Sequence, residues 1–196
     1  MPKIGIIILA AGSSSRMGKP KQLLPLGKGS MLSHVVQESL KSHAAEVICV
    51  LGANSTLIQS EINSSAVRVL INDSWQHGLG TSIACAVEHC EHLDALLITL
   101  GDQPLVDTEY LNDMIREFRS NNDKIIATSY DGRPGVPALF PKAYFKDLQQ
   151  LTGDQGAKTI LKQNAPDIII LEANDKTFDV DTEADYNQLK AGSKTS

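Results

Sequence analysis

A cluster of cations follows a run of small residues near the start of the chain: Arg16, Lys19 and Lys21. The small residues form the sequence Leu-Ala-Ala-Gly-Ser-Ser-Ser over residues 9–15. Such residues let a ligand lie directly against the backbone, and Gly12 and Gly18 permit turns that a Cβ atom would forbid. Arginine and lysine supply positive charge and hydrogen-bond donors for phosphate oxygens. The segment therefore predicts a cradle for the phosphates of a nucleoside triphosphate.

The spacing of this loop excludes two common phosphate-binding motifs. A Walker loop needs a glycine, four residues and then Gly-Lys-Ser/Thr, whereas five residues separate Gly12 from Gly18 and Pro20 follows Lys19. The dinucleotide fingerprint G-x-G-x-x-G also fails, because Ser14 stands where its second glycine is required. A glycine- and serine-rich surface loop with incidental cations is the plain alternative.

A candidate metal-binding carboxylate follows a second aliphatic run. Residues 99–105 read Thr-Leu-Gly-Asp-Gln-Pro-Leu, so Asp102 lies just beyond the buried strand expected at 95–100. Mg²⁺ prefers hard oxygen ligands and is commonly held by one or two carboxylates together with phosphates. The alternative is a helix N-cap, but Asp107 or Thr108 is better spaced for that role. The pattern favours Asp102 as a metal ligand.

Two more aspartates occur near the end of the chain, in the sequence Phe-Asp-Val-Asp-Thr-Glu-Ala-Asp-Tyr over residues 178–186. Asp179 and Asp181 are two residues apart, so they point the same way in extended backbone. Asp181 or Thr182 is also well placed to cap the next helix, with Asp185 in its first turn. Both interpretations stay open from the residues alone.

A third loop, residues 72–82, opens a helical pattern. Gly78 and Gly80 allow a planar base to approach the backbone, while Ser82 offers a hydroxyl and the helix start offers free N–H groups. A plain N-cap loop is the alternative, and Trp75 is more typical of packing than of base stacking. The glycine- and proline-rich stretches at 132–140 and 153–158 have the composition of turns.

These five segments, in this order, resemble the motifs of MobA-like nucleotidyltransferases, the relatives of the molybdenum-cofactor cytidylyl- and guanylyltransferases. The first loop matches L-A-[AG]-G-x-[SA]-x-R-M-G-x-x-K from Leu9 to Lys21, and Gly-Asp-Gln-Pro resembles the metal-binding motif. The pattern [DN]-[IV]-[DN]-T-x-x-D matches at 179–185, with Asp181 as the second metal-facing residue. The loop at 75–82 resembles the W-x-x-G-[LM]-x-x-S base-recognition motif. The segments at 132–140 and 153–158 resemble the acceptor side.

The resemblance implies Mg²⁺-dependent transfer of a nucleotide from a nucleoside triphosphate to a phosphorylated acceptor, with release of pyrophosphate. The catalytic residues it implies are Arg16, Lys21 and Asp102, with the metal on Asp102 and Asp181. Its nucleotide-binding residues are Leu9, Ala10, Ala11, Gly12, Ser13, Arg16, Lys21, Gly78, Gly80 and Ser82. Its acceptor-binding residues are Gly135, Pro137, Asp154 and Lys158.

The identity of the nucleotide and of the acceptor rests on finer features. Leu-Ala-Ala-Gly resembles the cytidylyl branch, and Ala11 fills space that a larger purine needs, so CTP is the expected donor. The resemblance makes molybdopterin carrying molybdenum the expected acceptor and allows transient contact with a molybdoenzyme or chaperone. GTP as donor, another phosphorylated acceptor, and a regulator or cofactor chaperone without turnover are the alternatives.

Alternating strands and helices must position these loops. Strands are expected at 4–9, 46–51, 67–71, 95–100, 124–128, 138–140 and 168–171; helices are expected at 31–42, 56–63, 81–90, 107–119, 147–151, 157–163 and 183–189. Repeated β-α units predict an α/β, three-layer αβα fold around a mostly parallel sheet. The resemblance implies that this is a Rossmann-like nucleotidyltransferase (nucleotide-diphospho-sugar transferase) fold.

Ligands collect beyond the carboxyl ends of the strands in such a sheet. The first loop, the segment after residue 100 and the Trp75 loop are therefore expected to meet in one cleft. A single domain is expected over 1–190, followed by a flexible tail at 191–196.

Composition limits the remaining possibilities. The 196 residues carry a net charge of −5, which argues against a general nucleic-acid binder because such proteins present a basic surface. The first residues lack a signal-peptide pattern, and no apolar run approaches the roughly 20 residues of a bilayer span. A cytoplasmic protein without membrane contact is expected. Cys49, Cys85 and Cys90 show no C-x-x-C spacing, which favours core packing over a metal site or disulfides.

Overall fold

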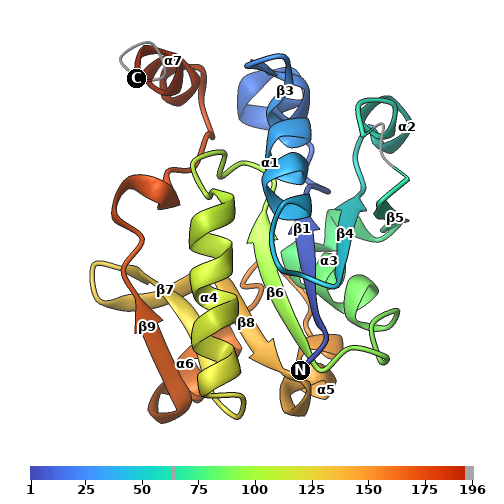
Figure 1. The fold of residues 1–196 in the computed structure, drawn as a ribbon. Coiled ribbons are helices and arrows are strands. Elements are labelled where there is room, and N and C mark those ends of the chain that lie inside the picture. The colour runs from blue at the N-terminus through green and yellow to red at the C-terminus, as the bar shows by residue number, and fades with distance from the viewer. Residues whose placement is uncertain (63–64, 193–196) are drawn as a thin grey trace.

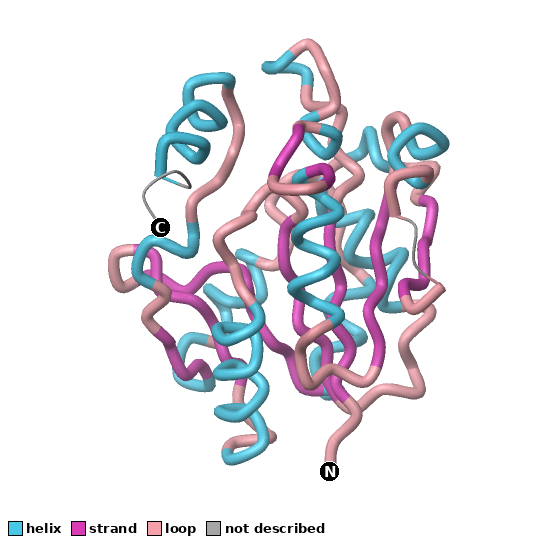
Figure 2. The backbone as a smooth tube through the Cα atoms, turned by 45° about the horizontal axis from the view of Figure 1, so that its top comes forward, coloured by secondary structure: helices cyan, strands magenta, loops and turns pink. Residues whose placement is uncertain are grey.

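A central sheet holds the molecule together. The computed structural model describes residues 1–62 and 65–192, and these form a seven-stranded sheet in the order β5-β4-β1-β6-β8-β7-β9. Its strands are β1 (Ile4–Leu9), β4 (Glu46–Leu51), β5 (Val67–Ile71), β6 (Ala95–Leu100), β7 (Ile125–Tyr130), β8 (Arg133–Pro141) and β9 (Ile168–Leu171). Helices cover both faces of the sheet (Figure 1, Figure 2). The expected mostly parallel, three-layer α/β architecture is confirmed.

Seven α-helices occur among the described residues: α1 (Met31–Leu40), α2 (Ser55–Gln59), α3 (Leu79–Val87), α4 (Thr108–Ser120), α5 (Phe145–Gln149), α6 (Lys158–Gln163) and α7 (Glu183–Gly192). Short 3₁₀ turns add η1 (Ser15–Met17), η2 (Lys21–Leu23), η3 (Trp75–His77), η4 (Lys142–Tyr144), η5 (Ala165–Asp167) and η6 (Asn174–Thr177). The turns η1, η2 and η3 lie in the loops that the sequence marks as functional.

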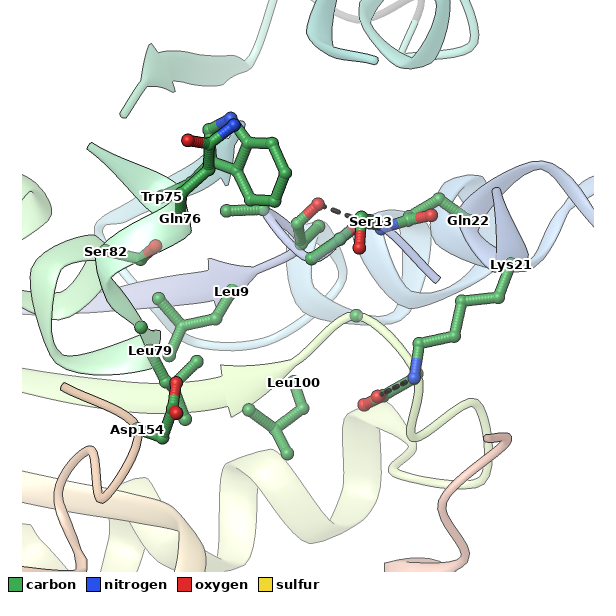
Figure 3. A pocket seen from close by; sticks show the side chains of 16 residues that line it. Leu9, Ser13, Lys21, Gln22, Trp75, Gln76, Leu79, Ser82, Leu100 and Asp154 are labelled. Carbon is green, nitrogen blue, oxygen red and sulfur yellow. Dashed lines mark hydrogen bonds and ion pairs between the residues drawn. The ribbon is translucent and has the colours of Figure 1, made fainter. Parts of the chain in front are cut away.

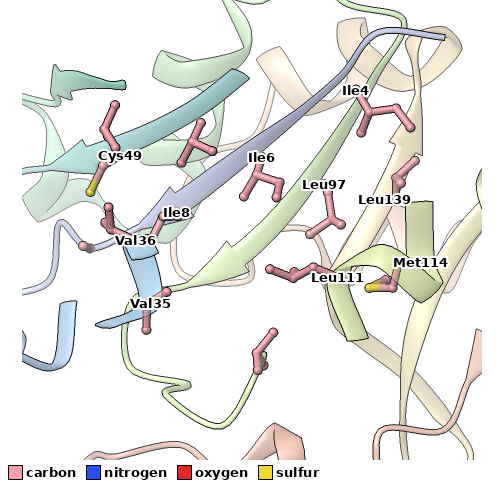
Figure 4. Close-up of a cluster of buried hydrophobic side chains, with 14 of the residues drawn as sticks. Ile4, Ile6, Ile8, Val35, Val36, Cys49, Leu97, Leu111, Met114 and Leu139 are labelled. Atoms are coloured by element: carbon pink, nitrogen blue, oxygen red, sulfur yellow. The ribbon is translucent and has the colours of Figure 1, made fainter. Parts of the chain in front are cut away.

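Burial on both faces explains the unbroken aliphatic composition of β1. Ile4, Ile6 and Ile8 belong to one apolar cluster with residues of α1, α2 and α4 (Figure 4). Ile7 and Leu9 belong to a second cluster with residues of α3, α5 and α6. β1 pairs in parallel with both β4 and β6, so the carboxyl ends of these three strands open to the same edge of the sheet.

The strand β8 is longer than the sequence predicts and runs against its neighbours. It pairs antiparallel with both β6 and β7. Glycines and prolines at 132–137 favour a turn, and only 138–140 was expected as a strand. The turn is instead confined to Asp131 and Gly132, whose φ angles are 51° and 76°. An Asp-Gly pair with positive φ is a common two-residue hairpin connection, so the strand resumes at Arg133.

Several smaller elements also differ from expectation. A hairpin of β2 (Pro25–Leu26) and β3 (Gly29–Ser30) precedes α1, and no pattern in the sequence pointed to it. Helix α3 begins at Leu79, two residues before the expected 81. Helix α2 is shorter than the expected 56–63, whose last residue lies outside the described part of the chain. Of the expected tail at 191–196, residues 191 and 192 continue α7, while 193–196 lie outside the described residues.

The N-terminus of α4 offers a test of local stability. The Asp107 side chain caps this helix by accepting a hydrogen bond of 2.9 Å from the Tyr110 backbone N–H, and it also pairs with Lys176. We expect Asp107→Ala to lower the free energy of unfolding by about 1 kcal/mol, the usual loss of an N-cap. Asp107→Asn keeps a capping oxygen and removes only the half-exposed ion pair, so its loss should be smaller. Urea unfolding measures the free energy of unfolding of both variants. If both lose the same amount, the effect comes from the ion pair with Lys176 and not from the cap.

None of the helices in the described part of the chain combines the length and apolarity that a bilayer span needs.

Candidate functional site

A cavity of about 380 Å³ lies at the carboxyl ends of β1 and β6 (Figure 3). Its lining comes from the first loop, the loop before α3, the segment after β6 and the loop before α6. The lining residues are Leu9, Ala10, Ala11, Gly12, Ser13, Lys21, Gln22, Trp75, Gln76, Gly78, Leu79, Ser82, Leu100, Gly101, Asp102 and Asp154. The expected meeting of three loops in one cleft is confirmed.

A buried glutamine holds the first loop in shape. The Gln22 side chain is 3% exposed, and its amide donates to the carbonyl oxygens of Ala10 at 3.1 Å and Gly12 at 3.0 Å. Its Oε1 accepts from the Ser14 hydroxyl, which in turn accepts from the backbone N–H of Lys21. Sequence reasoning missed Gln22, which follows Lys21 and precedes the apolar residues 23–26.

Opposite charges from three distant parts of the chain meet beside the cavity. The Lys21 ammonium lies 2.5 Å from an oxygen of Asp102 and 2.8 Å from an oxygen of Asp181. Arg16 reaches the second oxygen of Asp181 at 3.1 Å. Lys21 and Asp102 line the cavity, whereas Arg16 and Asp181 extend the cluster beyond it. The residues expected to bind phosphate and metal are therefore neighbours in the fold.

The charges in this cluster shift the pKa of Lys21 and of Asp181. Burial by itself lowers the pKa of Lys21, but the charges and hydrogen bonds of Asp102 and Asp181 outweigh it, so the pKa is raised. The pKa of Asp181 is lowered, first by the hydrogen bond from Lys21 and also by Arg16. Both partners of the Lys21–Asp181 pair are thus charged at neutral pH.

The donor set at this cluster fits a hard divalent cation. Asp102 Oδ1 is buried and has no hydrogen-bond partner among the described residues, which leaves a carboxylate oxygen available to a cation. No group of three or more His, Cys, Asp or Glu side chains placed to hold a metal ion occurs in the described ranges 1–62 and 65–192. Such a cation would take the rest of its ligands from phosphate oxygens and water, as Mg²⁺ commonly does. Asp102 and Asp181 are the residues that would hold it.

Asp179 faces a different partner from Asp181. Its Oδ1 accepts a hydrogen bond of 2.9 Å from Gln103, a fully buried side chain that also donates to the Tyr130 hydroxyl at 2.7 Å. Burial is the main cause that raises the pKa of Asp179, and the charge of Asp102 raises it further.

The segment 179–181 is also held by a backbone hydrogen bond, in which the Val180 N–H donates to the Asp102 carbonyl at 3.0 Å. This network fixes the 179–181 segment against the loop after β6. Sequence reasoning did not single out Gln103.

The two glycines expected at the base-binding loop are packed against the loop before α6. Gly78 has a φ of 104°, and a Cβ atom there would lie 2.3 Å from the carbonyl carbon of Gly153. A Cβ atom on Gly80 would lie 2.8 Å from the Thr152 nitrogen, and the Gly80 N–H donates to the Gly153 carbonyl at 2.8 Å. Gly78 lines the cavity and Gly80 does not. Both residues have a packing reason to be glycine, and their nucleotide contact stays a prediction.

Of the four residues expected on the acceptor side, the cavity lining includes Asp154 and not the other three. Asp154 lines the same cavity as the first loop. Lys158 is exposed at the start of α6 and is not part of the lining. Gly135 packs against the ring of Tyr130, because a Cβ atom on Gly135 would lie 2.6 Å from a carbon of that ring. The Pro137 carbonyl accepts from the Thr128 hydroxyl at 2.6 Å. Acceptor binding by these four residues stays a prediction.

The cysteines lie apart from this cavity. Cys49 and Cys90 are buried and Cys85 is half-buried, and all three are free thiols. Burial raises the pKa of Cys49 and of Cys90 to about 12, so both thiols are protonated and inert at neutral pH. The expectation of core packing is confirmed for these two.

Comparison with known proteins covers most of the chain. A sequence model of the MobA-like NTP transferase domain matches residues 6–168. The molybdenum cofactor cytidylyltransferase of Escherichia coli (strain K12) is 30% identical over 197 residues, 97% of each chain. Nicotine blue oxidoreductase of Paenarthrobacter nicotinovorans is 25% identical over 193 residues, 93% of this chain and 94% of that protein. The chain also matches bifunctional GlmU proteins but spans only 34% of the length of one from Ruthia magnifica.

A solved structure agrees with the fold over almost the same span. Rv0371c from Mycobacterium tuberculosis H37Rv is similar with a TM-score of 0.85 and 26% identity, covering 96% of this chain and 97% of that one. The M. tuberculosis protein has also been solved in complex with manganese. The range matched by the family model, residues 6–168, includes every residue that lines the cavity.

Proposed function

This chain belongs to the MobA-like NTP transferase domain family of nucleotidyltransferases, and on that premise we propose that it transfers CMP from CTP to the phosphate of molybdopterin carrying molybdenum, releasing pyrophosphate. Nucleotidyltransferases of this family generally depend on a divalent metal, and we propose Mg²⁺ for this chain. The observation that carries the proposal is the contact of Lys21 with Asp102 and Asp181 at the rim of the cavity.

The chain's own residues have a limited task in such a reaction. A phosphate monoester is already ionised near neutral pH, so its attack on the α-phosphorus of the triphosphate requires no general base. Lys21 and Arg16 would neutralise the charge of the triphosphate and of the departing pyrophosphate. Gln22 fixes the loop backbone on which the phosphates would lie, and fixed geometry lowers the barrier by removing the cost of orientation. Mg²⁺ held by Asp102 and Asp181 would supply further charge neutralisation.

Two observations favour a pyrimidine nucleotide over GTP. Ala11 is buried beside the cavity. Gly52 packs directly behind its side chain, since a Cβ atom added to Gly52 would lie only 2.9 Å from the Ala11 Cβ atom. The cavity wall is therefore closed at Ala11. The similarity to the E. coli cytidylyltransferase covers the full chain.

Pyrophosphate release tests the proposal directly. The protein is incubated with Mg²⁺, molybdenum-loaded molybdopterin and either CTP or GTP at equal concentration. We expect kcat/KM with CTP to exceed that with GTP by about tenfold or more, the scale set by a closed pocket wall. Reactions without acceptor and with chelator are the controls. A preference for GTP would overturn the choice of nucleotide. Nucleotide binding without any release would instead indicate a regulator or cofactor chaperone.

A further inference from the structure

The cavity has two polar ends separated by an apolar middle. Lys21 lies at one end, and Ser82 and Asp154 lie at the other, with Leu9 and Leu100 between them (Figure 3). The Asp154 carboxylate sits against the backbone of Gly78, because a Cβ atom on Gly78 would lie 2.6 Å from its Oδ1. If the phosphates lie at the cationic end, the carboxylate meets the far end of the nucleotide, which is the base.

The hydroxyl group of Ser82 is set up to donate a hydrogen bond at this end. Asn72 Oδ1 accepts from the Ser74 backbone N–H at 2.9 Å, which fixes the orientation of the amide. The Asn72 Nδ2 group then donates to the Ser82 hydroxyl oxygen at 3.0 Å. Ser82 is 2% exposed, and its own hydrogen has no acceptor among the described residues. The hydroxyl hydrogen is therefore available to a ligand in the cavity.

Together these groups form a matched pair for one edge of a base. Ser82 offers a donor and Asp154 offers only acceptors, because an ionised carboxylate carries no hydrogen. Cytosine presents the complementary pattern, with an amino group at C4 next to the acceptors N3 and O2. Uracil presents a carbonyl oxygen at C4 and an N–H at position 3, so its C4 oxygen would face the carboxylate.

We infer that Asp154 reads the nucleobase, accepting a hydrogen bond from its exocyclic amino group, and so excludes bases that lack one. The inference rests on the proposed function and adds its specificity element. A carboxylate at this place is unfavourable to a phosphate of either substrate, since like charges repel. It is favourable to an amino group, and a base that presents a carbonyl oxygen at this position is disfavoured, because two acceptors then face each other without a hydrogen between them.

Nucleotide binding, followed without the acceptor, tests the inference independently of turnover. Trp75 is the only tryptophan of the chain and lines the cavity, so its fluorescence reports occupancy. Affinities are measured with Mg²⁺ for CTP against UTP and for GTP against ITP; each pair differs at an amino group of the base. The variants are Asp154→Asn and Asp123→Asn. Asp123 is an exposed carboxylate just before β7, at the opposite edge of the sheet, and its substitution makes the same change of charge.

For the unsubstituted protein we expect CTP to bind about tenfold or more tightly than UTP. Asp154→Asn should bring that ratio to within about threefold, because an amide can turn to donate to the C4 oxygen of uracil. Asp123→Asn should leave the ratio unchanged. If Asp154→Asn keeps the full ratio while melting normally, the inference is wrong and the proposed function stands. If the unsubstituted protein prefers GTP, the choice of CTP as the nucleotide is wrong. The inference is then tested by the ratio of the affinities for GTP and ITP. A reduced ratio in Asp154→Asn would support Asp154 as the residue that binds the amino group, and an unchanged ratio would overturn the inference.

Discussion

Substituting asparagine for Asp102 is expected to lower metal-dependent turnover by about a hundredfold or more, the scale on which an electrostatic catalyst acts. One oxygen of Asp102 bonds Lys21 at 2.5 Å, and the other is buried without a partner among the described residues. An amide at this position is neutral, so it retains the shape of the side chain and loses the charge that holds a cation. Pyrophosphate release across a range of Mg²⁺ concentrations measures the effect.

Asp179 supplies the matched comparison for this substitution. It lies two residues from Asp181 and already accepts a hydrogen bond from Gln103. Because asparagine retains that acceptor, we expect Asp179→Asn to lose less than about tenfold in turnover. Binding of Mn²⁺ in the presence of nucleotide, followed by electron paramagnetic resonance, gives a reading that does not depend on turnover. Near-normal turnover and Mn²⁺ binding in Asp102→Asn would remove Asp102 from the site.

The strands that carry the site are the part of the fold that the sequence predicts best. The limits of β1 and β6 agree with the aliphatic runs at 4–9 and 95–100, because strands buried on both faces require apolar residues at every position. The sequence of strand β8 does not show this apolar pattern. Its prolines and glycines are those of a turn, and only pairing with β6 and β7 on either side makes it a strand.

The contacts within the site depend on the fold rather than on local spacing. Lys21 meets Asp102 across 81 positions and Asp181 across 160. Motif resemblance nominated these residues, but only the sheet and the backbone bond from Val180 to Asp102 bring them together. Gln22, Asn72 and Gln103 were missed because a buried amide that braces a loop leaves no periodic pattern. The place of Asp154 in the wall of this cavity also depends on the fold, because its loop reaches the cavity by packing on Gly78 and Gly80.

Lys21 is expected to matter far more for turnover than for folding. Lys21→Ala removes the ammonium that contacts two carboxylates, and we expect turnover to fall by about a hundredfold, because transition-state charge on the phosphates is no longer neutralised. The side chain lies at the rim of the cavity and contributes little to the apolar clusters, so the melting temperature should fall by only about a few degrees.

The stability of Lys21→Ala should also respond to a divalent cation in a particular way. Without the ammonium, Asp102 and Asp181 keep like charges near each other, and Mg²⁺ can relieve the repulsion. Added Mg²⁺ should therefore raise the melting temperature of Lys21→Ala more than that of the unsubstituted protein. Lys19→Ala is the control, because Lys19 is an exposed cation of the same loop with no ion pair among residues 1–62 and 65–192; its turnover should stay within about threefold. Equal losses of turnover in the two lysine variants would show that general positive charge, and not the contact with Asp102 and Asp181, accounts for the effect.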